Sequence, residues 1–125
     1  VNELEKALKH RSRAVRTLAV WALGQKGPAA AGTLPALKAA LKDDNDAFRK
    51  SVVKAMARMG PRAVSELSDL LKHADAGVSE SAAQALGGMG ADAVAALPAL
   101  KAAAQDREPA VQAAVEEAVR KLEGK

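Results

Sequence analysis

The chain has 125 residues, a formal net charge of +4 and no cysteine. A chain of this length can bury a modest core, and the lack of cysteine excludes disulfides and thiolate metal sites. Its apolar residues are mainly 31 alanines, 14 leucines and 11 valines, beside one Trp and one Phe. Because alanine and leucine favour helices and aromatic residues are scarce, the composition predicts an all-α protein.

The two ends of the chain carry no targeting signal that can be recognised. No apolar run reaches the length of a membrane span, and no signal-peptide pattern opens the sequence, so we expect no membrane contact. The first residue is Val1 rather than methionine. We therefore expect a segment of a longer protein, and the sequence does not indicate its compartment.

Internal repetition is the strongest signal in the sequence, and the run LPALKAA occurs at both 34–40 and 97–103. Equivalent positions are separated by offsets of 33, 30 and 33 residues, which defines four repeats. The core positions Val15, Phe48, Val78 and Val111 illustrate this alignment. The repeats cover approximately residues 1–27, 34–60, 64–90 and 97–124.

Each repeat has the pattern of two helices, because apolar residues recur at intervals of three and four. The second helix of the first three repeats begins behind a residue that can cap it, namely Ser12, Asn45 or Asp75. The fourth repeat has Glu108 there, a weaker cap, followed by Pro109 at a favourable first position. The pattern thus predicts eight helices.

Glycine is expected to close every second helix, at Gly27, Gly60, Gly90 and Gly124. Glycine adopts the left-handed conformation that ends a helix without a steric penalty. The GGMG run at 87–90 is accordingly interpreted as a helix end rather than a phosphate loop, since no Lys-Ser/Thr pair follows it.

Three runs resemble the HEAT-repeat family, especially its short bacterial form that also occurs in phycobilin lyases. They are AVRTLAVWALGQKGP at 14–28, LPALKAALKDDND at 34–46 and AFRKSVVKAMARMGP at 47–61. The resemblance implies an α-solenoid of four two-helix repeats in a right-handed superhelical stack, forming one domain over residues 1–125. It implies no particular activity, because this fold serves many functions.

The residues do not assemble into a recognisable catalytic or metal site. His10 and His73 occupy equivalent places two repeats apart, too far to share a metal, and neither is followed by the Glu of HEAT-like di-iron hydroxylases. We interpret both as cations near helix C-termini. We interpret the Asp-rich turn at 43–46 as a solvated capping turn, because the glycine and distal glutamate of a calcium loop are missing. No cofactor is expected.

Charge is distributed unevenly along the chain. Residues 1–63 contain 13 Lys/Arg against 5 Asp/Glu, a net charge of +8, whereas residues 64–125 contain 6 against 10, a net charge of −4. This split is explained by an ordinary solvated surface, by end-to-end self-association, or by a basic patch that receives an anionic partner.

The second helices are expected to line the concave face, and their solvent side is the candidate contact surface. In the first repeat the core should comprise Val15, Ala19, Ala22 and Leu23, while Val20 and its equivalent Val53 should face solvent. Trp21 aligns with polar residues in the other repeats, so it either binds a partner or packs on a preceding repeat. The predicted partner-binding residues are Arg13, Arg16, Trp21, Arg49, Lys50, Lys54 and Arg58.

From these observations we expect a non-enzymatic, monomeric scaffold that binds another protein, one with an acidic surface, on its concave face. Nucleic-acid binding through the basic patch is the first alternative, although a single Trp gives no row of stacking aromatics. A phycobilin-lyase-like enzyme or accessory subunit is the second, although no Cys, Tyr or paired carboxylate supports it.

Overall fold

The computed structural model describes residues 2–105 and 108–124, and every regular element in this part of the chain is helical. The chain divides into two compact units, unit 1 (Val1–Ala63) and unit 2 (Val64–Lys125), each containing two of the predicted repeats. The predicted all-α fold of two-helix repeats is confirmed, whereas the right-handed sense of the stack and the single domain stay predictions.

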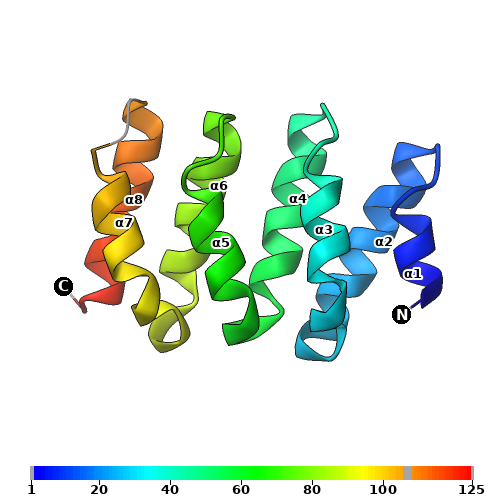
Figure 1. Ribbon diagram of the computed structural model, residues 1–125, viewed down its shortest axis with the longest axis horizontal. Helices are drawn as coiled ribbons and strands as arrows, with labels where there is room; N and C mark the ends of the chain where they lie inside the picture. Colours follow the sequence, from blue (N-terminus) through cyan, green and yellow to red (C-terminus); the bar gives the residue numbers. More distant parts are fainter. Residues whose placement is uncertain (1, 106–107, 125) are drawn as a thin grey trace. The chain divides into compact units, whose positions relative to one another are not determined.

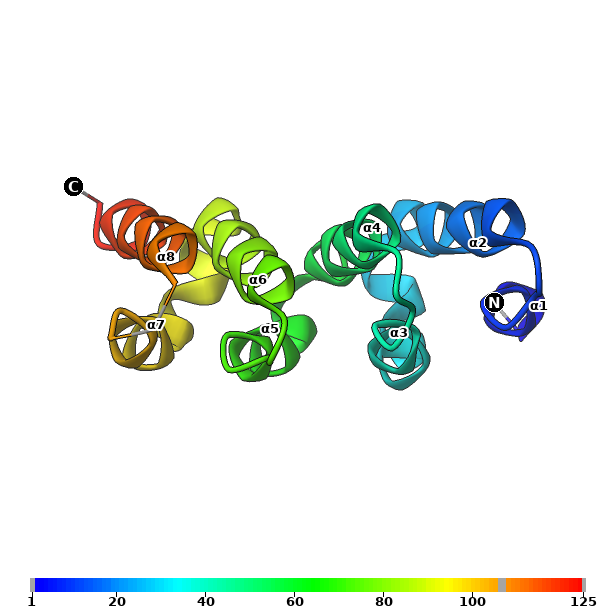
Figure 2. The same cartoon turned by 90° about the horizontal axis from the view of Figure 1, so that it is seen from above.

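Unit 1 contains two helix pairs, each followed by a 3₁₀ segment. The pairs are α1 (Asn2–Ala7) with α2 (Arg13–Lys26), and α3 (Leu34–Ala40) with α4 (Asp46–Ala57). The 3₁₀ segments are η1 (Gly27–Thr33) and η2 (Gly60–Ala63). The first helices α1 and α3 lie in one layer and the longer second helices α2 and α4 in the other, as Figures 1 and 2 show.

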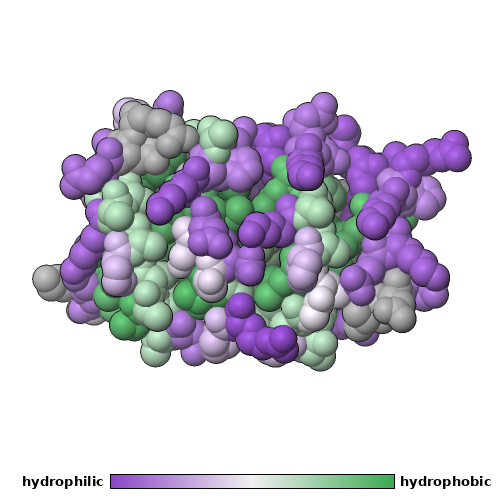
Figure 3. Space-filling model, viewed as in Figure 1, coloured by the Kyte–Doolittle hydropathy of each residue, from purple (hydrophilic) through white to green (hydrophobic). Residues whose placement is uncertain are grey.

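Unit 2 repeats this arrangement. Its pairs are α5 (Val64–Leu70) with α6 (Ala76–Gly88), and α7 (Leu97–Ala103) with α8 (Pro109–Leu122), and η3 (Gly90–Ala96) joins them. Here too the second helices α6 and α8 form one layer and α5 and α7 the other (Figure 2). In the space-filling view of Figure 3, hydrophilic side chains are interspersed with smaller hydrophobic areas.

The predicted caps of the second helices are confirmed. The side chains of Ser12, Asn45 and Asp75 accept hydrogen bonds from the backbone N–H three residues further on. Glu108 makes no such capping bond, and Pro109 begins α8 as expected. The capping residue thus fixes where α2, α4 and α6 start.

The predicted closing glycines are confirmed as well. Gly27, Gly60, Gly90 and Gly124 have φ angles of 60°, 82°, 68° and 77°, all in the region that disfavours side chains. A 3₁₀ helix begins at three of these glycines, Gly27, Gly60 and Gly90, and the repeat pattern did not predict these segments. In η1 the Thr33 hydroxyl donates to the Ala30 carbonyl oxygen at 2.7 Å, which ties this segment together.

Two expectations about the core of the second helices are wrong. Val20 and Val53 are 1% and 0% exposed, although both were placed on the solvent side. Val20 lies on the side of α2 that faces α4 and lines the space between these two helices. The expected core residues Ala19 and Leu23 are buried, and Phe48 is buried as predicted. A neighbouring repeat therefore widens the buried face of each second helix.

Within the described residues, no helix combines the length and the apolar character that crossing a membrane requires.

Candidate partner-binding groove

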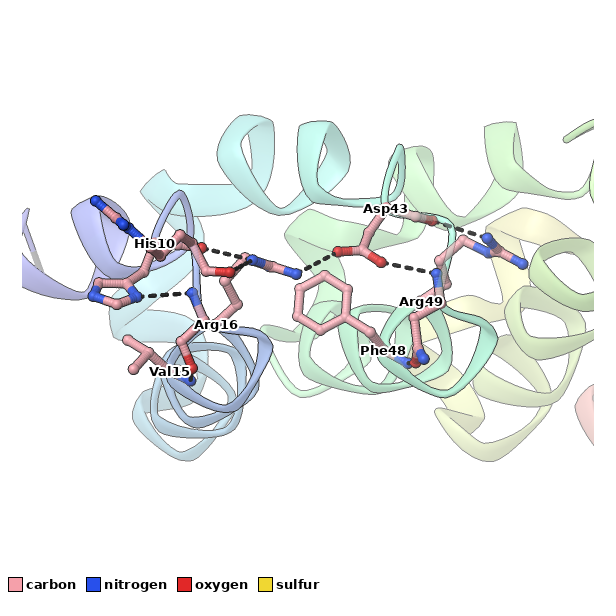
Figure 4. A network of polar contacts seen from close by, with 9 residues as sticks. His10, Val15, Arg16, Asp43, Phe48 and Arg49 are labelled. Atoms are coloured by element: carbon pink, nitrogen blue, oxygen red, sulfur yellow. Dashed lines mark hydrogen bonds and ion pairs between the residues drawn. The ribbon is translucent and has the colours of Figure 1, made fainter.

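Arg16, one of the predicted contact residues, is held inside unit 1 by a polar network (Figure 4). Its Nη2 donates to Asp43 Oδ2 at 3.0 Å, and its Nη1 donates to the carbonyl oxygens of His10 and Arg11. The guanidinium lies 5.7 Å from the centroid of the Phe48 ring. Arg16 therefore connects α2 to the turn before α4, and only 19% of its side chain is exposed.

Asp43 is the acceptor at the centre of this network. The Asn45 backbone N–H, which donates to Asp43 Oδ1 at 2.8 Å, lowers the pKa of the carboxyl group, and the nearby Arg16 guanidinium lowers it further against the opposing effect of burial. Hydrogen bonds and positive charge both favour the ionised form. Asp43 is consequently a charged structural residue.

Two further predicted contact residues are engaged in the same region. Arg49 donates through Nη1 to the Asp43 carbonyl oxygen at 2.9 Å and pairs with Asp46, and its side chain is 14% exposed. Lys50 forms a more exposed ion pair with Asp46 at 3.5 Å. Three of the predicted partner-binding residues, Arg16, Arg49 and Lys50, therefore form ion pairs within unit 1.

Each of the two histidines accepts a hydrogen bond that closes the turn before a second helix, and their interpretation as cations near helix C-termini stays a prediction. His10 Nδ1 accepts from the Ser12 backbone N–H, and His73 Nδ1 accepts from the Asp75 backbone N–H, both at 3.0 Å. His10 thus does in its repeat what the Asp43 carboxylate does in the next one.

The remaining predicted residues that come together are Trp21, Lys54 and Arg58, which border a groove between α2 and α4. We call this the α2–α4 groove. It encloses about 190 Å³ and is lined by Thr17, Val20, Trp21, Gly24, Gln25, Ser51, Lys54, Ala55 and Arg58. Arg13 is exposed but does not line it.

Small residues form the floor of the groove and let the two helices approach closely. A Cβ added at Gly24 would lie 3.3 Å from the Cα and Cβ of Ala55 and from Cδ of Arg58. The absence of a side chain at Gly24 therefore lets α2 pack closely against Ala55 and the Arg58 stem. Val20 and Ala55, which are buried, complete an apolar floor.

The rim of the groove combines an exposed aromatic ring with free positive charges. The prediction that Trp21 faces solvent is confirmed, since it is 63% exposed. Lys54 and Arg58 are exposed, and neither has an ion-pair partner among residues 2–105 and 108–124. Exposed Trp and Arg side chains are the types enriched at binding hot spots.

Leu18 is a surface residue that sequence reasoning missed. It is 65% exposed and lies three residues before Trp21, so both residues are on the same side of α2. Its equivalents in the other repeats are Ser51, Ser81 and Ala114, all small or polar. The repeat alignment contains this signal, because Leu18, like Trp21, is a large apolar residue at a position where the other repeats have small or polar ones.

Comparison with known proteins places this arrangement in a family. The family model described as HEAT repeats matches residues 1–63 and 34–120. The chain belongs to the HEAT-repeat family. It is similar to human deoxyhypusine hydroxylase in complex with glycerol, with 28% identity and a TM-score of 0.79 over 99% of this chain and 43% of that one.

A second similar structure is an engineered protein, with 20% identity and a TM-score of 0.59 over 97% of this chain and 61% of that one. This likeness concerns the fold alone. No match was found among curated proteins. The HEAT-repeat chain thus spans less than two thirds of the length of either structure.

The HEAT repeats of unit 2 form an equivalent groove between α6 and α8, with different chemistry. This α6–α8 groove encloses about 320 Å³, and eight of its ten lining residues lie 63 positions after a residue that lines the α2–α4 groove. Gly87 and Ala118 match Gly24 and Ala55 in the floor, whereas the rim differs. The residues lining the α6–α8 groove are Glu80, Ala83, Gln84, Gly87, Ala110, Ala113, Ala114, Glu117, Ala118 and Lys121.

In the α6–α8 groove, carboxylates replace the Thr17 hydroxyl and one of the two cations of the α2–α4 groove. Glu80 stands in place of Thr17, and Glu117 in place of Lys54. Glu117 pairs with Arg120, whose hydrogen bond lowers the pKa of the Glu117 carboxyl group. The two grooves therefore share a framework but present different surfaces to solvent.

Proposed function

We propose that this chain is a non-enzymatic scaffold that binds a partner protein in the α2–α4 groove. The observation that carries the proposal is the exposed Trp21 beside the unpaired cations Lys54 and Arg58, over an apolar floor. The exposed Trp21 ring and the charges of Lys54 and Arg58 form no hydrogen bond or ion pair with the described residues of unit 1 that would stabilise its fold. An interface that covers the ring and pairs the charges would use all of them.

A protein partner fits this surface better than a nucleic acid does. Arg16, Arg49 and Lys50 are engaged with aspartates, which leaves fewer free cations than the sequence suggests. Duplex binding draws its affinity from many simultaneous phosphate contacts. The two cations beside this short groove can pair with a few anionic groups, and its apolar floor can accept one apolar side chain.

The hydroxylase activity named for the human structure does not enter the proposal. That protein is more than twice as long as the region matched by this chain. The two histidines here are each committed to a backbone N–H of their own turn, and neither is followed by Glu. No group of three or more His, Asp or Glu side chains in the described part of the chain is arranged to hold a metal ion.

A selection from a displayed library of random peptides tests the proposal. The target is the whole chain, and the counter-target is the Trp21→Gln/Lys54→Glu variant. Both replacements are the residues that unit 2 carries at the equivalent positions, so the framework accommodates them. Circular dichroism should give the same helical signal for both proteins.

We expect peptides that bind the wild-type chain and not the variant. If repeated selection yields only peptides that bind both proteins equally, the α2–α4 groove is not the binding surface. A parallel titration with labelled duplex DNA at low salt separates the alternative, because binding by DNA that the double substitution abolishes would make nucleic acid the ligand of this groove.

A further inference from the structure

We infer that the occupant of the α2–α4 groove is an acidic peptide segment with one bulky apolar side chain. In this arrangement the apolar side chain packs against Trp21 over the groove floor, and carboxylates of the segment pair with Lys54 and Arg58. This inference rests on the proposed function and specifies the chemistry of the partner.

The charges on the rim define the acidic part of the segment. Arg58 is the C-cap residue of α4 and follows Lys54 by four positions, so the two residues are separated by about 6 Å along the helix axis. No carboxylate is among the residues that line the groove. Two carboxylates match this spacing when they are four residues apart on a helix or two apart on an extended segment.

The size and floor of the groove define the apolar part. A volume of about 190 Å³ is below the range of about 300–1,000 Å³ typical of pockets for drug-sized ligands. The floor is Val20, Gly24 and Ala55, and the indole of Trp21 rises beside it. One large aliphatic or aromatic side chain is the ligand that uses this space and also covers the exposed ring.

Comparison with the α6–α8 groove shows which residues of the α2–α4 groove are not required for packing of the two helices. Its floor retains the Gly and Ala of the α2–α4 groove, and Lys121 retains the positive charge of Arg58. Gln84 and Glu117 replace Trp21 and Lys54. Trp21 and Lys54 are therefore additions to a framework that packs without them, and we attribute to them the preference for an acidic, apolar segment.

The first experiment uses defined probes with the whole chain. A fluorescein-labelled peptide of glutamates around one central leucine is titrated with the protein and followed by anisotropy. We expect Trp21→Gln and Lys54→Glu each to weaken binding at least about tenfold, as expected for loss of an anchor residue. A peptide with glutamine in place of glutamate, and one with glycine in place of leucine, should each bind at least about tenfold more weakly.

A transplant of the rim provides the matched control. On the Trp21→Gln/Lys54→Glu background, the substitutions Glu80→Thr, Gln84→Trp and Glu117→Lys give the α6–α8 groove the rim of the α2–α4 groove. We expect the acidic peptide to bind again, within about tenfold of the wild-type affinity, and higher salt to weaken this binding.

The outcomes separate this inference from the proposed function. If library selection yields neutral or basic peptides that the Trp21→Gln/Lys54→Glu variant rejects, the groove is a binding site and the acidic preference is wrong. The inference is also overturned if the acidic peptide binds wild type and variant alike, or if a folded transplant fails to bind it. Absence of any groove-dependent peptide removes the proposed function itself.

Discussion

Gly87 and Gly88 are adjacent in α6, yet alanine should have opposite effects on stability at the two positions. A Cβ at Gly87 would lie 3.0 Å from Ala118 Cα and 3.1 Å from Ala118 Cβ. A Cβ at Gly88 would meet no atom within 4 Å. Neither glycine has a positive φ angle, so alanine at each position is compatible with the helical backbone.

The magnitudes follow from two opposing terms. Replacing glycine by alanine in a helix favours folding by up to about 1 kcal/mol. At Gly87 the added methyl group must push α6 and α8 apart, and overpacking of this kind costs about 1–3 kcal/mol. We therefore expect Gly87→Ala to lower the free energy of unfolding by about 1 kcal/mol and Gly88→Ala to raise it by about 0.5 kcal/mol.

Urea unfolding followed by far-UV circular dichroism measures this difference. With a slope of about 2 kcal/mol per molar urea, the midpoint of Gly88→Ala should exceed that of Gly87→Ala by somewhat less than 1 M. Similar slopes for the two variants would show that the midpoints report stability. Equal midpoints, or a higher midpoint for Gly87→Ala, would refute the close approach of α6 and α8 at Gly87.

Three further predictions concern unit 1. Arg16→Ala should lower the free energy of unfolding by about 1–3 kcal/mol, because it leaves Asp43 part-buried without its charged partner. Lys54→Ala should change this free energy by less than about 0.5 kcal/mol, and urea titration of the two variants measures the difference. Asn45→Ala should lower the free energy of unfolding by about 1 kcal/mol by removing the cap of α4, whereas Asn45→Asp keeps a capping oxygen; equal losses in the two variants by urea titration would contradict the assignment of this cap. Because the pKa of Asp43 is lower in the folded protein than its usual value near 3.8, its stabilisation is present above that value and is lost as pH falls through the folded pKa. Thermal unfolding across this acidic range should therefore depend less steeply on pH in Asp43→Asn than in wild type, and identical pH profiles would contradict this role.

The repeat pattern predicts the local structure well because its signals are local. Ser12, Asn45 and Asp75 cap helices whose N–H groups are three residues away, and Gly27 closes α2 through its own φ angle. Such features depend on short stretches of sequence. They needed no knowledge of how the repeats pack.

Contacts between repeats were harder to predict. Arg16 has a charged partner 27 residues away in the turn before α4, so its side chain is not on the open surface that its helical position suggested. Val20 is buried because α4 covers that side of α2. The predicted partner-binding residues included cations that pair with aspartates, namely Arg16, Arg49 and Lys50, and cations that do not. Only the structure shows that Lys54 and Arg58 belong to the second group.

Amide-resolved NMR of the whole chain titrated with a selected acidic peptide tests the central claim most directly. Trp21 is the only tryptophan, so its indole N–H resonance reports on the groove without ambiguity. We predict shifts of that resonance and of the backbone amides of Thr17, Lys54 and Arg58. Shifts confined to the α6–α8 groove, at Glu80, Gln84 and Glu117, would contradict the account.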